Sequence, residues 1–415
     1  MAYLHMDVPQ TRFKAGDTLT GTVCLRGKED VDVQTIMVSL VGRCKSKFTR
    51  STGQSTITYR GRAPLFYARQ VLFTGPYTLR PGHSWDFSFQ FPHRCMSTSQ
   101  DPFKQQGPFN LDRSQSLPPS FTDNHHVYGW STECFVSYQL EARLISSKIK
   151  IFGSGETESN RRLEFFITRD SENPEPNFTT ATRSFSIASV ALEPGREDAP
   201  LTIKEKLKSS WSSKKLPLAK FKLQMLVPSI AVVSKPLPLI LKLDHDFEGS
   251  TTMAPPMVRL RKCSVELRAS TKAQCIRNEI FSDGDVQRTW ESSLSIGSCD
   301  LSGRTEPLTE NLDLGKLLRL GIQKHHKPNF TTFNMRRDYK LCIKVTFECA
   351  QKTFKVDFWN YQFTLLPADY APSGCEAEDA PELSTMFMED PEEAAPAYEP
   401  SSLPPPPTYQ GAKHT

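Results

Sequence analysis

The residues whose types and order most clearly suggest chemistry lie near the end of the chain, in SSLPPPPTYQGAKHT. Pro406, Pro407, Thr408 and Tyr409 form a Pro-Pro-x-Tyr motif, and two further prolines precede it. Consecutive prolines adopt a polyproline II helix before any partner binds, so little conformational entropy is lost on binding. Such segments dock into the aromatic grooves of WW domains, where the tyrosine fills a second pocket. The motif therefore predicts a WW-domain docking site, and the alternative is an inert proline-rich tail.

A partial copy of this motif lies upstream, in AAPAYEP. Pro396 and Tyr398 keep the second proline and the tyrosine, but Ala395 replaces the first proline. We interpret this stretch as a weak auxiliary site at best, and the alternative is that it binds nothing.

The stretch LTIKEKLKSSWSSKK has the spacing of a short amphipathic helix. Ile203, Leu207 and Trp211 recur every four residues, with lysines between them. An apolar stripe beside positive charge suits an anionic membrane surface. A solvated linker is the alternative, since so short a helix is marginal alone. The candidate lipid contacts are Lys204, Lys206, Lys208 and Trp211.

A phosphorylation site is suggested by the order Arg183-Ser184-Phe185-Ser186, which resembles the target of a basophilic kinase. A phosphate on Ser184 or Ser186 would weaken attraction to an anionic membrane. We state this as a hypothesis, to be discarded if phosphopeptide mapping never finds either serine modified.

The sequence contains little that indicates an enzyme. The adjacent pairs His125-His126 and His325-His326 are poor metal pairs, because neighbours on a strand point to opposite faces. The chain contains no GxxxxGK[ST], HExxH or GxSxG motif. Its ten cysteines are scattered without a CxxC, as expected of buried thiols in a reducing compartment. We therefore expect no catalytic residue, metal or cofactor.

Charge is distributed unevenly along the 415 residues. From Ala368 onward there are ten acidic residues and one lysine, a charge of −9, which leaves +14 for residues 1–367 because the whole chain carries +5. A basic body suggests an anionic partner, such as a membrane surface or a phosphorylated peptide. Nucleic acid is not expected, because the basic residues follow strands without aromatic residues placed for stacking.

Apolar residues alternate with a period of two along most of the first 170 residues, as in DTLTGTVCLR, SWDFSFQFP and ECFVSYQLEARL. Short alternating segments broken by Gly, Pro, Asp and Ser predict half-buried antiparallel strands and a β-sandwich. Gln100 to His126 interrupts this pattern, and we expect a long loop there. The start of the chain lacks the charge and apolar pattern of a signal peptide, so we expect a soluble intracellular protein.

The same alternation returns in the second half, as in YKLCIKVTFEC and KTFKVDFWNYQFTLLP. Between the two halves the sequence is a mixture of Pro, Ser, Thr and charged residues, which predicts a linker. The expected organisation is a sandwich at 1–170, a disordered Ser/Pro/Lys-rich linker at 171–216, a second sandwich at 217–367 and a disordered acidic, proline-rich tail at 368–415.

Several stretches resemble the arrestin superfamily, and within it the α-arrestins, which are arrestin-related trafficking adaptors. RFKAGDTLTGTVCL resembles the opening strand pair of the family, HSWDFSFQFP its aromatic strand, and CFVSYQLEARL the strand that closes the first domain. PNFTTFNMRRDYKLCIKVTFEC resembles part of the second domain. The likeness covers residues 1–168 well and 217–367 more loosely. It implies an all-β chain of two tandem antiparallel, immunoglobulin-like sandwiches.

The resemblance also implies a function and partners. An α-arrestin is an adaptor that brings a HECT-type ubiquitin ligase, through its WW domains, to a plasma-membrane transporter or receptor. It implies a cytoplasmic protein recruited to the plasma membrane and endosomes. Two alternatives stay open: an arrestin-fold endosomal sorting subunit that works without ubiquitin, and an all-β enzyme whose site the sequence does not reveal.

Overall fold

The structure is a computed structural model that describes residues 2–53, 55–96, 112, 114–146, 156–165, 177–196, 202–204, 216–277, 285–302, 308 and 311–368. These residues form mostly β-strands, with short helical segments such as η1 (Val190–Leu192) and α2 (Leu314–Leu317). This confirms the expectation of an all-β chain. Met1–Tyr370 is one compact unit, and the second unit, Ala371–Thr415, lies outside the described residues.

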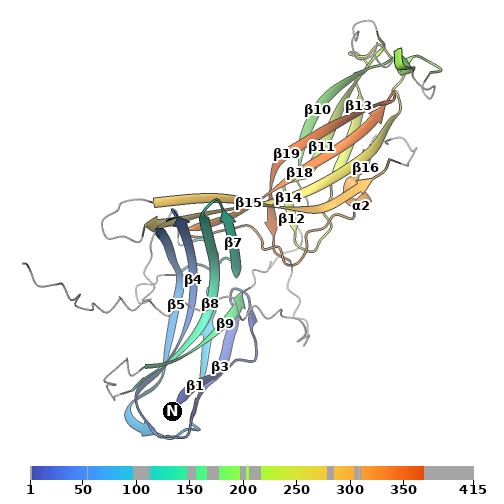
Figure 1. Cartoon of the computed structure of the whole chain (residues 1–415). Coiled ribbons are helices and arrows are strands. Elements are labelled where there is room, and N and C mark those ends of the chain that lie inside the picture. Colours follow the sequence, from blue (N-terminus) through green and yellow to red (C-terminus); the bar gives the residue numbers. More distant parts are fainter. Residues whose placement is uncertain are drawn as a thin grey trace, which may run out of the picture. The chain divides into compact units, whose positions relative to one another are not determined.

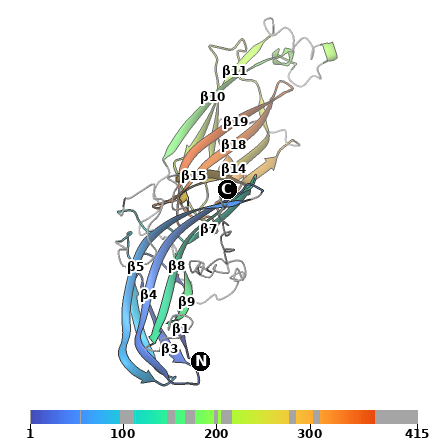
Figure 2. The same ribbon diagram turned by 60° about the vertical axis from the view of Figure 1, so that its left-hand side comes forward.

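The N-terminal sandwich packs a small antiparallel sheet against a larger one. The small sheet has the order β1-β3-β6, and the larger one runs β5-β4-β8-β9-β2, with β7 paired to the start of β8. Figures 1 and 2 show β5, β4, β8 and β9 side by side. The strands are β1 (Tyr3–Asp7), β2 (Arg12–Phe13), β3 (Thr18–Arg26), β4 (Val31–Ser51), β5 (Thr56–Leu79), β6 (Ser84–Gln90), β7 (Phe121–Val127), β8 (Trp130–Ser146) and β9 (Glu156–Phe165).

The C-terminal sandwich has the same two-layer plan. One sheet has the order β10-β11-β13-β16, and the other runs β12-β19-β18-β14, with β15 on β14 and β17 on β18. The strands are β10 (Phe178–Ala188), β11 (Leu218–Pro228), β12 (Ile230–Val232), β13 (Ile240–His245), β14 (Val258–Arg277), β15 (Asp285–Asp300), β16 (Asn311–Asp313), β17 (Phe330–Thr331), β18 (Met335–Cys349) and β19 (Lys352–Leu366).

The period-two pattern of the sequence becomes the inner face of each strand. On β8 every second residue from Val136 to Leu144 is buried, and on β18 the same holds from Leu341 to Cys349. Burying one such side chain contributes about 1.5–3 kcal/mol to folding. Tyr138 also buries its hydroxyl, which donates to the carbonyl oxygen of Pro118 at 2.6 Å. Alternation in the sequence thus decided which side chains form the two cores.

The prediction of a disordered linker at 171–216 is wrong for part of that segment. Within 171–216, residues 178–188 form β10, which pairs along its whole length with β11. The sequence signal was weak because β10 is an edge strand with one exposed face, so only Ala181 and Ile187 are fully buried in it. The adjoining η1 is buried as well. Residues 171–176, 197–201 and 205–215 of the expected linker lie outside the described residues.

The two sandwiches are joined by strand pairing as well as by side chains. Ile276 and Arg277 of β14 pair with Arg60 and Tyr59 of β5, so the large sheets of both sandwiches are continuous. The core of the N-terminal sandwich also includes side chains from the second half of the chain: Ala273, Cys275, Trp290, Phe330, Phe333 and Met335. This junction is the setting of the polar residues described next.

Candidate functional site

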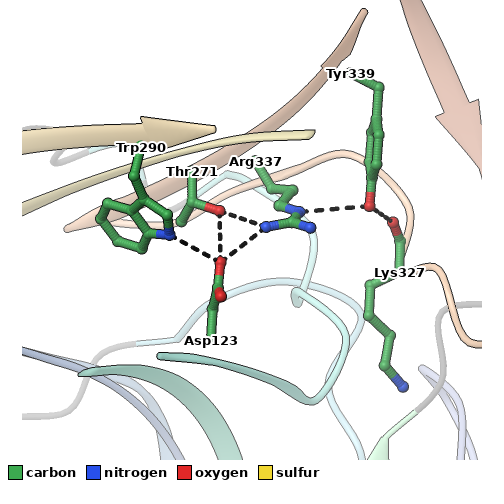
Figure 3. Close-up of polar contacts among 6 residues, drawn as sticks. All are labelled: Asp123, Thr271, Trp290, Lys327, Arg337 and Tyr339. Atoms are coloured by element: carbon green, nitrogen blue, oxygen red, sulfur yellow. Dashed lines mark hydrogen bonds and ion pairs between the residues drawn. The ribbon is translucent and has the colours of Figure 1, made fainter. Parts of the chain in front are cut away.

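A carboxylate of the N-terminal sandwich accepts three hydrogen bonds from the C-terminal sandwich (Figure 3). Asp123 Oδ2, on β7, lies 2.9 Å from Thr271 Oγ1, 3.1 Å from Trp290 Nε1 and 2.9 Å from Arg337 Nη1. The three donors come from β14, β15 and β18. Hydrogen bonds between a carboxylate and charged or polarised donors are stronger than neutral ones. Asp123 therefore ties one strand of the first sandwich to three strands of the second.

Arg337 extends this cluster into the second sandwich. Its Nε donates to the hydroxyl of Tyr339 at 3.4 Å, and that hydroxyl donates to the carbonyl oxygen of Lys327 at 2.6 Å. The guanidinium also hydrogen-bonds Thr271 and lies 5.2 Å from the centre of the Phe121 ring. Only 12% of the Arg337 side chain is exposed. A guanidinium this buried needs its carboxylate partner, because an unpaired buried charge is costly.

The backbone of β7 explains how Asp123 reaches the junction. Phe121, Asp123 and His125 lie on the same face of the strand because side chains alternate. Phe121 packs against Phe330 with ring centres 5.1 Å apart, and His125 stacks on Trp290 at 6.1 Å. Asp123 is thus held between two aromatic contacts on its own strand, which fix the position of the carboxylate.

A second polar layer is fully buried within the junction. Asn334 Nδ2 donates to Ser46 Oγ at 3.1 Å, and Ser46 Oγ donates to the carbonyl oxygen of Gln274 at 2.9 Å. Ser46 and Asn334 have no exposed surface. A side-chain carbon added at Gly61 would overlap the Gln274 carbonyl and the Ser46 hydroxyl. Close approach of the two sandwiches therefore requires glycine at this position of β5.

Two thiols, a tyrosine and a histidine near the junction have pKa values shifted toward their neutral forms. Burial raises the pKa of the Cys275 thiol to about 12 and that of Cys134 well above its ordinary value. Burial raises the pKa of Tyr339 too, although Arg337 opposes this. Burial, with His325 and Arg337 close by, lowers the pKa of His326 to about 4. These groups suit packing and hydrogen bonding, not nucleophilic attack or proton transfer near neutral pH.

None of the site residues proposed from the sequence that the structure describes lies in this junction. Ser184 and Ser186 are exposed on the edge strand β10. Lys204 is exposed and helical, whereas Lys206, Lys208 and Trp211 lie outside the described residues. The motif residues Pro396, Tyr398, Pro406, Pro407, Thr408 and Tyr409 also lie outside them. Among the described residues, no helix is long and apolar enough to cross a membrane, and no group of His, Cys, Asp and Glu could hold a metal ion.

Sequence reasoning missed Asp123 because it lies in the segment expected to be a loop. Phe121 to Val127 contains Asp, Asn and two histidines and has apolar residues only at its two ends, so it carries little strand signal. Its partners Thr271, Trp290 and Arg337 are ordinary strand residues. Only the pairing of β7 with β8 and the closeness of β14, β15 and β18 bring these four together.

Comparison with known proteins agrees with this geometry. No curated protein sequence matches the chain significantly. The family model described as the N-terminal domain of arrestin (or S-antigen) matches residues 3–167. The match begins with β1 and continues past the end of β9, so it covers the strands of the first sandwich. Residues 3–167 therefore resemble an arrestin N-terminal domain, and this match supports placing the protein in the arrestin superfamily.

Proposed function

We propose that the protein is an α-arrestin-type adaptor that recruits a WW-domain HECT ubiquitin ligase to membrane-protein cargo. The observation that carries the proposal is the combination of an arrestin N-terminal domain at residues 3–167 with the motif Pro406-Pro407-Thr408-Tyr409. The arrestin superfamily consists of non-enzymatic adaptors, so the domain match supports an adaptor-type role in trafficking. The ligase, the cargo and the docking motif are the further steps that we propose.

The mechanism rests on effective concentration. An adaptor that binds a ligase through one segment and a cargo through another converts their encounter into an intramolecular event. The preformed polyproline segment limits the entropy lost when the ligase docks. The junction around Asp123 and Arg337 supports this role because it joins the two sandwiches into one body for holding cargo. The transfer of ubiquitin is then performed by the ligase.

Recruitment to membranes follows from the same proposal. Residues 1–367 carry a net charge of +14, which suits binding to anionic lipid. The proposed lipid contacts are Lys204, Lys206, Lys208 and Trp211. Phosphorylation of Ser184 or Ser186 would oppose this contact. Both serines are exposed on β10, so their hydroxyls are open to solvent. The expected location is the cytoplasm, with recruitment to the plasma membrane and endosomes, where transporters or receptors serve as cargo.

Replacement of Tyr409 by alanine is expected to weaken binding of ligase WW domains about thirtyfold or more, because one buried aromatic anchor contributes about 2 kcal/mol or more at such interfaces. Isothermal titration of purified WW domains into the full-length protein and the variant measures the effect. Tyr398→Ala is the matched control, because it removes an equivalent tyrosine from the incomplete motif. The Tyr398→Ala variant should lower the affinity for the WW domains by less than about threefold.

Equal binding by the full-length protein and Tyr409→Ala would show that the ligase does not dock on this motif. The same conclusion follows if neither binds. A ubiquitin-independent sorting subunit built on the same arrestin domain would then account better for the sequence.

A further inference from the structure

Two cysteines of the C-terminal sandwich face each other across a pair of strands. Cys263 on β14 lies directly opposite Cys299 on β15 in the antiparallel register. Both are thiols in the structure. Cys263 belongs to the core of this sandwich, and Cys299 packs against that core, so both side chains point to the same face of the sheet. No other pair of cysteines in the described part of the chain is aligned in this way.

The backbone distances suit a disulfide. Residues directly opposite in antiparallel strands have Cα atoms about 4.5 or 5.5 Å apart, depending on the type of pair. A disulfide requires a Cα separation of about 4.4–6.8 Å, and Cβ separations of opposite residues also match its requirement. The strands therefore bring the two sulfur atoms within bonding reach without rearrangement of the backbone.

The register at this position is fixed by neighbouring contacts. The next cross-strand pair is an ion pair, with Lys262 Nζ 2.8 Å from Asp300 Oδ2. Beyond it, the amide of Leu301 donates to the carbonyl oxygen of Arg261 at 2.6 Å. These contacts hold the end of β15 against β14, so the two cysteines cannot slide apart by a change of register.

The two thiols differ in their access to solvent. Cys263 is only 2% exposed, and burial, followed by the proximity of Cys299, raises its pKa to about 12. Cys299 is half-buried and therefore open to a small oxidant. Oxidation then begins at Cys299, because it is the more accessible of the two thiols.

We propose that Cys263 and Cys299 are an oxidation site that forms a reversible intramolecular disulfide on exposure to a peroxide. The thiolate of Cys299 attacks one oxygen of hydrogen peroxide, the O–O bond breaks, and a sulfenic acid and water result once the leaving hydroxide is protonated. The sulfur of Cys263 then attacks the sulfur of Cys299. The S–O bond breaks, the thiol proton of Cys263 combines with the leaving hydroxide, and a second water is released. Each disulfide thus consumes one peroxide, and a dithiol reductant reverses it.

The position of the disulfide gives it a structural consequence. Among the strands described, β15 pairs only with β14. Further along the same strand, Trp290 donates to Asp123 and the guanidinium of Arg288 lies 4.2 Å from the centre of the Trp130 ring. A covalent bond between β14 and β15 would restrain an edge strand that reaches the junction of the two sandwiches. The oxidised protein is therefore expected to exchange the backbone amides of β15 more slowly.

The test is peptide mapping of the full-length protein after treatment with hydrogen peroxide, blocking of remaining thiols and digestion without reductant. The expected result is a cross-linked peptide containing Cys263 and Cys299, lighter by two hydrogen atoms than its parts, that disappears after reduction by dithiothreitol. Cys299→Ser should abolish this product. Cys24→Ser is the matched control, because Cys24 is also half-buried but faces His5 and Ser84, and it should leave the product unchanged.

Three results would overturn the proposal: oxidation of Cys299 to sulfinic acid without a cross-link, a disulfide between two chains, or a cross-link that survives in Cys299→Ser. Mapping of the wild-type protein does not depend on any variant folding. Circular dichroism of Cys299→Ser checks that the variant keeps its β-structure. Hydrogen exchange of the oxidised and reduced wild-type protein then shows whether β15 is the strand that is restrained.

Discussion

Replacement of Asp123 by alanine is expected to lower the free energy of unfolding by about 2–4 kcal/mol. The variant removes the carboxylate that accepts hydrogen bonds from Thr271, Trp290 and Arg337. It leaves a guanidinium that is 12% exposed without its anionic partner. Removing one partner of a fully buried ion pair costs about 3–5 kcal/mol. The loss here is expected to stay below the top of that range, because 23% of the Asp123 side chain is exposed and water can enter. Urea unfolding followed by tryptophan fluorescence measures the change, since Trp290 lies in the cluster.

The control for this prediction is Asp338→Ala, on β18 next to Arg337. Asp338 pairs with Arg336 at 2.7 Å, but their side chains are 33% and 54% exposed. An exposed pair contributes about 0–1 kcal/mol, so this variant should unfold at nearly the wild-type urea concentration. The double variant Asp123→Leu with Arg337→Met should recover part of the stability lost in Asp123→Ala, because no unpaired charge remains. If Asp123→Ala and Asp338→Ala are equally mild, the junction does not depend on the Asp123 cluster.

Replacement of Gly61 by alanine is expected to destabilise the protein by about 1–3 kcal/mol, the range typical of overpacking. The added methyl group would overlap the carbonyl oxygen of Gln274, which is backbone and cannot rotate away. It would also displace the hydroxyl of Ser46, which bridges Asn334 and Gln274. Because the preceding residue, Arg60, pairs with Ile276 of β14, the strain falls on the strand pairing that joins the two sandwiches. Thermal unfolding by calorimetry measures the loss.

Gly321→Ala is the control for Gly61→Ala. The nearest atom to an added carbon there is the carbonyl oxygen of Lys235 at 3.7 Å, which is an ordinary contact. This substitution is expected to change stability by less than about 0.5 kcal/mol. If Gly61→Ala unfolds at the same temperature as wild type, the two sandwiches have room to separate at β5 and β14, and the description of the junction as closely packed is wrong.

The sequence by itself determined the all-β class and most of the buried faces. Alternation along SWDFSFQFP predicted an inner face on which Phe87, Phe89 and Phe91 are buried and Trp85 is partly buried. The pattern is informative because a strand with one buried face must place an apolar residue at every second position. The same reasoning failed for β10, whose edge position needs few apolar residues, and for β7, whose inner face meets the other sandwich partly through polar side chains.

Only the tertiary structure decided which distant residues meet. Asp123 contacts residues that follow it by more than a hundred positions, and Cys263 faces Cys299 only because β14 and β15 pair in one register. Neither contact has a periodic signature, since each depends on a single position in each strand. Local composition and periodicity specify which face of a strand is buried. The pairing of strands and the docking of sandwiches, which depend on the whole chain, specify what that face touches.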